Sequence, residues 1–554
     1  MIFKKINFLL LICLLGLSSG LLSQKLHLNL TSKGPLENLF LTTLPFQQKH
    51  SDTISIQREL KRIERQLKLH GFFLSSLDST LIKKTTVTAF FSLKEKLDTV
   101  ALHFKQKPTF LLPTFKFKDS ILSLPMHALE ETLEKISDSY ENAGNAFSKI
   151  NLKNFRIKDK KLFAEIQFTT AKKRKINKLI FKGYPDFPRS FIRNHFEIRE
   201  HSVFNKKRLQ EFSKLSQSLS FATEIKPPET LFTRDSTFVY IYLKKKKGSS
   251  FDGLVNFTSQ ESGKIQFNGH LDLKLNNLLN KGERLALLWN HYGNEKQELQ
   301  LSTATPYIFN SKISPELKFS LYKQDSTFLN TTLHTNIPYQ IKKNASLYVS
   351  FTATKSEKLE NTSLENITSF KSNFLGFGYQ LRVPKNNFLK KTSFSLDINP
   401  SFGKRKDTNG NSHQIKLEST LSYLLDVNRR SSLYFRNSIG VLNSDSYVEN
   451  ELFRIGGNSS IRGFKEQSLY VKEFVVQNIE YRYHTATDAF LYSITDVAFI
   501  STTERQEKLI GLGIGYLFST NNAQINISAA VGSSTKTPQN FKNTQLFVNW
   551  VNFF

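Results

Sequence analysis

The stretch LIGLGIGYLF, residues 509–518, alternates between large apolar side chains and glycines. In an extended chain, successive side chains point to opposite faces, so this stretch has one bulky apolar face and one nearly bare face. Such a period of two predicts a β-strand with one face against lipid or a core. The apolar face carries Ile510, Leu512, Ile514, Tyr516 and Phe518, and the bare face carries Gly511, Gly513 and Gly515.

Similar short alternating stretches fill residues 248–554, separated by turns rich in Asn, Lys, Ser and Gly. We count about sixteen, an even number, at about 19 residues per strand and turn, as in single-chain outer-membrane barrels. A soluble β-sandwich is the alternative, but it would expose many aromatic side chains. The sequence contains no run of 18 apolar residues, so it predicts no membrane-spanning helix. The sequence therefore predicts a mainly β fold with a C-terminal 16-stranded transmembrane antiparallel β-barrel.

Residues 24–247 instead mix helical and strand patterns. Apolar residues recur at helical spacing within residues 55–69 and again within residues 128–142, and each helix pattern ends near a glycine. Alternating stretches that predict strands follow each helix pattern. The sequence predicts three small α/β domains before the barrel, spanning residues 24–110, 111–174 and 175–247.

The first 23 residues have the features of a secretory signal peptide. Lys4 and Lys5 precede an apolar run of about 12 residues, which is short for a membrane span, and small residues follow it. The single cysteine, Cys13, lies inside this run, so the mature chain would contain no disulfide and no thiol chemistry. We expect an exported protein.

The net charge of +30 would ordinarily suggest a nucleic-acid partner. Export argues against nucleic acid, and the lysine runs are most simply solvated surface, with an anionic membrane surface as a secondary partner. The twelve histidines form no metal-binding motif, and no nucleophile elbow or nucleotide loop is present. We therefore expect no enzyme activity, no metal and no cofactor.

The stretch FRIGGNSSIRGFKEQSLY, residues 453–470, lies within the segment from about Asn443 to Val471, which is predicted to be the sixth external loop of the barrel. Charged side chains on the lipid face are costly, so Glu480 and Asp496 on the following strands should face the lumen. The glycine face of residues 509–518 leaves space there for another backbone. We expect the loop to enter the lumen and Arg462 to pair with Asp496 and Glu480. The alternative is a surface turn with a solvated arginine.

Together these features resemble the BamA/TamA and two-partner-secretion transporter superfamily, in which small POTRA domains precede a sixteen-strand barrel. The strand motif of that family keeps Asp496 here, with Ile494 in place of an aromatic residue and Ala498 in place of glycine. Glu480 stands in the family's Glu-Tyr-Arg step. The family's loop motif matches Gly457, Ile461, Arg462, Gly463 and Phe464. The outer-membrane targeting signal, a final phenylalanine after alternating apolar residues, is similar to Leu546, Val548, Trp550 and Phe554.

The resemblance implies a protein of the outer membrane with its N-terminal domains in the periplasm. It implies that the barrel seam opens and that unfolded outer-membrane or secreted proteins are the clients. Membrane lipid and accessory periplasmic or inner-membrane proteins would be the other partners. A general assembly factor is the leading hypothesis. A dedicated two-partner-secretion pore is the second, and a passive porin is the third.

Overall fold

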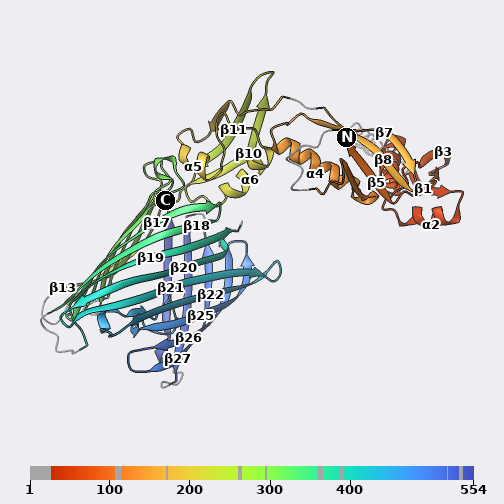
Figure 1. Ribbon diagram of the computed structural model, residues 1–554. Helices are drawn as coiled ribbons and strands as arrows, with labels where there is room; N and C mark the ends of the chain where they lie inside the picture. Colours follow the sequence, from red (N-terminus) through yellow and green to blue (C-terminus); the bar gives the residue numbers. More distant parts are fainter. Residues whose placement is uncertain are drawn as a thin grey trace, which may run out of the picture. The chain divides into compact units, whose positions relative to one another are not determined.

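The computed structural model describes residues 26–105, 115–169, 172–259, 265–292, 296–359, 366–385, 392–520, 522–535 and 541–554. The predicted signal peptide, residues 1–23, lies outside this part of the chain. Among the described residues, no helix has the length and apolar character needed to cross a membrane. The chain forms two compact units (Figure 1), the first being Met1–Arg174 with Val203–Lys206 and the second Lys175–Ser202 with Lys207–Phe554.

The first unit begins with a four-stranded sheet covered by two helices. Asp52 caps the N-terminus of the longer helix, where its carboxylate accepts a hydrogen bond of 2.6 Å from the backbone amide of Ser55. Its apolar face packs on the sheet, as the helical spacing predicts, with Ile63 and Leu67 fully buried. In spatial order the sheet holds β2 (Lys49–His50), β1 (Leu26–Ser32), β4 (Thr86–Ser92) and β3 (Ser76–Lys83), and the helices are α2 (Pro35–Thr43) and α3 (Thr53–Leu69).

A second four-stranded sheet follows, and it corrects the predicted domain boundary at residue 110. That boundary places the strand Thr99–Phe104 in the first domain. It instead pairs in parallel with Lys161–Thr169, and its buried Val100 and Leu102 belong to the second core. The sheet holds β6 (Ile121–Pro125), β5 (Thr99–Phe104), β8 (Lys161–Thr169) and β7 (Lys149–Lys158), with η2 (Met126–Ala128) and α4 (Leu129–Asn142).

The second unit starts with a third small α/β domain, whose sheet includes a strand that the sequence analysis missed. This strand, Ala222–Phe232, contains Pro227 and Pro228, which cannot donate ladder hydrogen bonds. It is tolerated because it lies at the sheet edge and its register shifts beside the prolines. The sheet holds β10 (Ala222–Phe232), β11 (Thr237–Lys245) and β9 (Lys178–Lys182), with α5 (Arg189–Asn194) and α6 (Lys206–Ser216).

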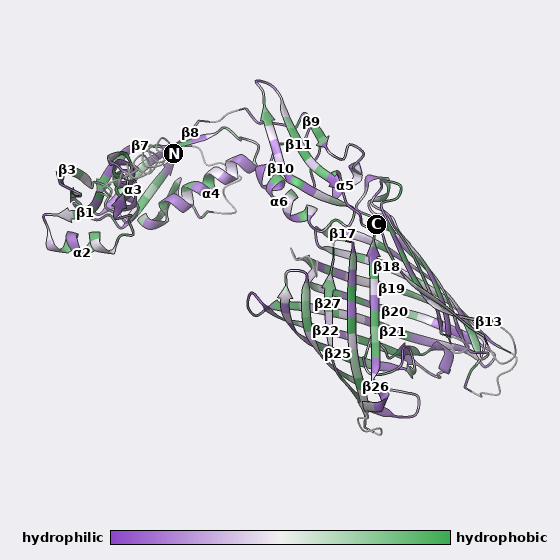
Figure 2. Cartoon of the chain, turned by 180° about the vertical axis from the view of Figure 1, so that it is seen from behind, coloured by the Kyte–Doolittle hydropathy of each residue, from purple (hydrophilic) through white to green (hydrophobic). Residues whose placement is uncertain are grey.

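The rest of the second unit is a closed antiparallel barrel of sixteen strands, which confirms the predicted fold class. Each of the sixteen alternating stretches forms one strand, and closure of the ring excludes an open sandwich. Figure 2 shows hydrophobic and hydrophilic residues alternating along the strands. The strands are β12 (Ser250–Ser259), β13 (Ile265–Asn276), β14 (Arg284–Tyr292), β15 (Lys296–Ala304), β16 (Glu316–Gln324), β17 (Phe328–Lys342), β18 (Ala345–Lys358), β19 (Phe370–Pro384), β20 (Thr392–Asp407), β21 (Gly410–Asp426), β22 (Ser431–Ser444), β25 (Glu473–Ala486), β26 (Ala489–Ser501), β27 (Gln506–Ser519), β28 (Ala523–Ser534) and β29 (Gln545–Phe553).

The third domain contacts short turns at one end of the barrel. The hydroxyl of Tyr184 donates to Asn280 Oδ1 at 2.8 Å, and Asn277 Nδ2 donates to that hydroxyl at 2.7 Å, both from the turn between β13 and β14. His195 Nδ1 lies 3.1 Å from the hydroxyl of Tyr307 in the turn between β15 and β16. These contacts distinguish the two barrel ends. The loop between β22 and β25 lies at the opposite end, because neighbouring strands are antiparallel.

Candidate functional site: the loop inside the barrel

The connection between β22 and β25 runs through the barrel interior. Its base is a two-stranded sheet of β23 (Phe453–Ile455) and β24 (Leu469–Val471), and a short turn, η4 (Glu449–Glu451), precedes it. On one wall, Lys296 Nζ of β15 donates to the backbone oxygen of Glu466 at 2.9 Å. On the same side, the hydroxyl of Tyr470 donates to Gln324 Oε1 of β16 at 2.9 Å. The loop therefore bridges the interior, since its tip contacts strands on the other wall.

The tip of the loop places Arg462 between two carboxylates of the barrel wall. Arg462 Nε and Nη2 donate to the two oxygens of Asp496 on β26, at 2.8 and 2.7 Å. Its Nη1 donates to Glu480 Oε1 on β25 at 2.7 Å, and its backbone amide donates to Asp496 Oδ2 at 2.9 Å. Asp496 is fully buried. The planar guanidinium thus satisfies both acids at once, a geometry that a lysine ammonium cannot reproduce.

A second arginine, Arg482, balances the charges of this cluster. Its Nε and Nη2 donate to Glu480 Oε2 at 2.9 and 2.5 Å, and its guanidinium lies over the rings of Tyr434 and Phe490. Two cations and two carboxylates are therefore buried together. Arg482 was not among the predicted lumenal residues, although it lies two residues after Glu480 and therefore on the same strand face. That shared face was the signal that could have identified it.

Glycines allow the loop backbone to touch the barrel wall. Gly463 has φ of +89°, and a Cβ added there would lie 2.5 Å from the Gly532 amide nitrogen on β28. A Cβ at Gly511 on β27 would collide with the carbonyl oxygen of Arg462. Of the three predicted wall glycines, only Gly511 makes room for the loop. Gly513 and Gly515 make room for neighbouring barrel residues instead, and Gly532 was missed.

Apolar residues on either side of Arg462 fix the tip by packing. Ile461 is fully buried in a cluster with wall residues that include Val476 and Ala498. Phe464 packs against the same cluster, and its ring lies over Gly532. Gly457 lies further back in the loop, with φ of +84°, where a side chain would collide with Glu466. Of the predicted motif residues, Gly457 therefore shapes the loop, and the other four contact the wall.

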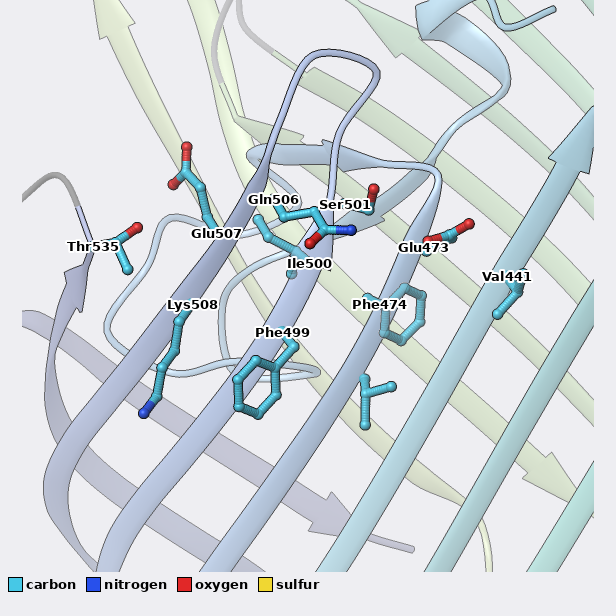
Figure 3. A pocket seen from close by; sticks show the side chains of 11 residues that line it. Val441, Glu473, Phe474, Phe499, Ile500, Ser501, Gln506, Glu507, Lys508 and Thr535 are labelled. Carbon is cyan, nitrogen blue, oxygen red and sulfur yellow. The ribbon is translucent and has the colours of Figure 1, made fainter.

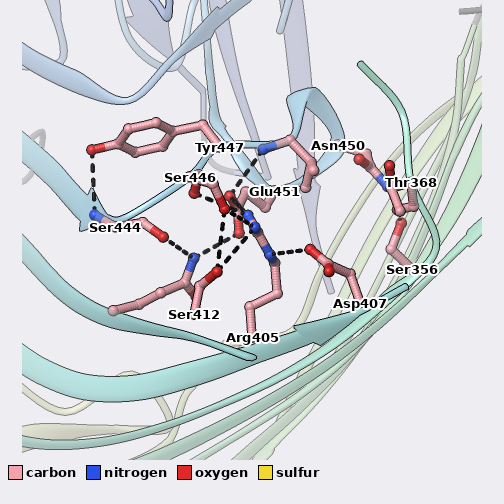
Figure 4. Close-up of polar contacts among 12 residues, drawn as sticks. Ser356, Thr368, Arg405, Asp407, Ser412, Ser444, Ser446, Tyr447, Asn450 and Glu451 are labelled. Carbon is pink, nitrogen blue, oxygen red and sulfur yellow. Dashed lines mark hydrogen bonds and ion pairs between the residues drawn. The ribbon is translucent and has the colours of Figure 1, made fainter. Parts of the chain in front are cut away.

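A second buried cluster fixes the first half of the loop (Figure 4). Arg405 of β20 is 1% exposed, and its Nε lies 3.0 Å from an oxygen of Asp407. Its other nitrogens pair with Glu451 and donate to Ser446 Oγ, the latter at 2.7 Å. Gln414 Nε2 donates to Glu451 at 2.8 Å. This cluster was not predicted, because Arg405 stands between two lysines in a stretch typical of a solvated turn.

The last strand closes the barrel against the first with a short junction. β29 pairs with β28 over eight residues, from Gln545 to Asn552. Within the part of the chain that the structure describes, it pairs with β12 only at Ser250 with Phe553 and Phe251 with Asn552. Beyond this junction, Asn549 Nδ2 donates to Asp252 Oδ2 at 2.6 Å. The predicted targeting residues Leu546, Val548 and Trp550 project outward, 70%, 64% and 56% exposed, and Phe554 follows the strand.

Hollows also lie outside the Arg462 cluster. One, of about 460 Å³, is found where β25 and β27 begin and β26 ends (Figure 3), and its lining includes Glu473, Phe499 and Lys508. Another, of about 490 Å³, lies between the third domain and the seam, and its lining includes Lys246 and Phe553. Within the described residues, no group of His, Cys, Asp and Glu has the arrangement of a metal site.

Comparisons with known proteins bear on the fold. The sequence matches no family model and no curated protein. Among solved structures, CdiB from Acinetobacter baumannii superposes with a TM-score of 0.52 at 14% identity, covering 90% of this chain and 97% of CdiB. The chain has the fold of CdiB. The resemblance inferred from the sequence is therefore confirmed at the level of the fold.

Two further structures are similar to this chain. CdiB from Escherichia coli has 13% identity and a TM-score of 0.49, covering 90% of this chain and 97% of that one. BamA from Haemophilus ducreyi, lacking POTRA domains 1-3, has 14% identity and a TM-score of 0.44, covering 81% of this chain and 98% of that one.

Proposed function

We propose that this chain is an outer-membrane protein that assembles client proteins into the membrane or moves them across it. The observation that carries the proposal is the seam, where β12 and β29 share only two register pairs among the described residues of an otherwise continuous barrel. Unpaired backbone groups are costly in lipid, so a short junction leaves strand edges that favour pairing with another strand. A client strand is the natural partner for such an edge.

The N-terminal domains support the same proposal. Each has a small sheet whose outer strands, such as β3, β7 and β10, are paired on one side only. An extended client segment could add to such an edge by backbone hydrogen bonds. In this proposal the three POTRA-like domains lie in the periplasm, receive unfolded clients and deliver them to the seam. The proposal assigns the chain no catalytic chemistry and no cofactor.

Depletion of the protein in its own host tests this proposal. Quantitative comparison of outer-membrane and secreted proteins should show a broad loss of barrel proteins. Loss of a single secreted protein, with the barrels intact, would instead support a dedicated export pore. Three N-terminal domains, rather than the two usual for secretion transporters, favour the assembly factor.

The loop in the barrel interior weighs against a passive porin. The Arg405 cluster holds the first half of this loop, the Arg462 cluster holds its tip, and Lys296 holds the segment after the tip against a further strand. A segment held in this way obstructs free diffusion of solutes. Single-channel recording of the purified protein should therefore show little steady conductance, whereas a porin would conduct continuously.

A further inference from the structure

The outer wall of the barrel carries a row of lysines at the end opposite to the third domain. Lys355 of β18, Lys371 of β19 and Lys406 of β20 are direct register partners on three neighbouring strands, and all three are exposed. Lys404 lies two residues before Lys406, is also exposed and is the register partner of His413 on β21. We refer to Lys355, Lys371, Lys404 and Lys406 as the lysine row.

The residues between these lysines show that the lysine row faces away from the lumen. Arg405, between Lys404 and Lys406, is buried inside the barrel against Glu451 of the loop (Figure 4). Ser356, next to Lys355, is likewise buried and accepts a hydrogen bond from the loop residue Asn450. Successive side chains of a strand point to opposite faces. The lysine row therefore lies on the membrane-facing surface.

An apolar row accompanies the lysine row on the same strands. Phe351, Leu375, Phe402 and Ile415 are register partners across β18, β19, β20 and β21, and each is 44–57% exposed. Phe351, Leu375 and Phe402 each lie four residues from a lysine of the row, or about 13 Å along a strand. The apolar side chains suit the hydrocarbon of a membrane. The lysines then lie toward its headgroups, where a cation on a barrel wall is tolerated.

The lysine row is electrostatically unbalanced. Lys355 pairs with Glu357, two residues along its own strand. Across the part of the chain that the structure describes, no carboxylate pairs with Lys371, Lys404 or Lys406. Like charges directly opposite one another in a sheet repel. Register partners on three strands span about 10 Å, so an anion with several charged groups could contact more than one lysine and offset that repulsion.

We propose that the lysine row binds the phosphate groups of a multiply phosphorylated glycolipid in the adjacent membrane leaflet. The apolar row would contact the acyl chains of the same lipid. This proposal rests on the proposed function only in placing the barrel in an outer membrane, with this end in the outer leaflet. Charge complementarity favours a lipid that carries at least two phosphates. A single phosphate group cannot contact all the lysines that a pair of phosphates can contact.

Lipid retention by the full chain in detergent tests the proposal. Native mass spectrometry would be run with diphosphoryl lipid A as the probe, and with phosphatidylglycerol as a singly charged probe. The variant K371Q/K404Q/K406Q should bind diphosphoryl lipid A about tenfold more weakly than the unaltered protein. The matched control K61Q/K83Q/K84Q removes three exposed lysines from the first domain and should bind normally.

Equal binding by the lysine-row variant and the unaltered protein would overturn the proposal, as would equal binding of phosphatidylglycerol and diphosphoryl lipid A. A stability measurement gives a second readout. Without lipid, the variant should unfold at a higher temperature because like-charge repulsion is removed, and added lipid A should raise the unfolding temperature of the variant less than that of the unaltered protein. K371Q alone provides the same comparison with less alteration. Neither readout involves a client, so failure here would be distinguishable from failure of the assembly function.

Discussion

At the scale of residues, the interior cluster illustrates how charges are accommodated inside the barrel. Arg462 and Arg482 are cations, and Asp496 and Glu480 are their acids, so the group carries no net charge. Burying an ion pair costs desolvation energy that the pairing roughly repays, whereas leaving one member unpaired is strongly unfavourable. The main effect of the cluster is therefore to fix one position of the loop, and its net contribution to stability is smaller.

Single removals from this cluster should be costly and coupled. Arg462→Ala leaves Asp496 and Glu480 facing one another without their shared cation, and the free energy of unfolding should fall by about 3–5 kcal/mol. Asp496→Ala should have a similar effect, and the double variant should lose much less than the sum. Urea unfolding in detergent measures all three. Lys465→Ala, an exposed position in the same loop, should change little, and additive losses would show that the pair does not interact.

His195 should make the third domain sensitive to acid. Burial lowers the pKa of His195 from 6.5 to about 4, with nearby Lys343 acting in the same direction. Below pH 6.5 the imidazole of His195 is protonated in the unfolded chain but stays neutral in the folded domain. The free energy of unfolding therefore falls as pH falls from about 6.5 to about 4. The full loss is about 3 kcal/mol. Thermal unfolding at pH 7 and pH 4.5 should show it, and His195→Phe should lessen the difference between the two pH values.

At the scale of elements, the barrel strands were predictable and the polar clusters were only partly so. Apolar and polar residues alternate along the barrel strands in the sequence, because one strand face points outward and the other points into the barrel. The Arg462 cluster could be predicted because Asp496 stands alone among apolar neighbours. The Arg405 cluster could not be predicted. Lys404, Arg405 and Lys406 are all basic, so charge does not show which of them faces the barrel interior. The strand β10 was missed because its prolines are compatible only with the edge of a sheet. The sequence alone does not reveal which strand lies at an edge.

The position of the loop should depend on the glycines beneath it. Gly532→Val would place a side chain against Gly463 and Phe464, so the tip would have to leave the wall. We expect faster hydrogen exchange or proteolysis of residues 456–468 and a loss of stability similar to that of Arg462→Ala. Gly34→Ala is a matched control, because its added Cβ would make only ordinary contact with Glu37. Unchanged protection of the loop would show that the tip does not need this close approach.

At the scale of the whole molecule, the barrel combines a firmly held interior with a weakly joined wall. Salt bridges and packing fix the loop to β20, β25 and β26, while β12 and β29 meet over two register pairs. These features are independent, since the loop contacts in the Arg462 and Arg405 clusters involve neither seam strand. A wall that opens can therefore separate at the seam without releasing the loop from the strands that hold it.

Locking the seam should abolish activity without disturbing the fold. Phe251 and Asn552 are register partners across the junction, so Phe251→Cys with Asn552→Cys can form a disulfide that joins β12 to β29. Under oxidising conditions this variant should assemble few client barrels, and a reductant should restore assembly. Leu512→Cys with Val531→Cys joins β27 to β28, where the pairing is continuous, and should remain active when oxidised. If the locked seam supports normal client levels, clients do not pass through this junction and the proposed route is wrong.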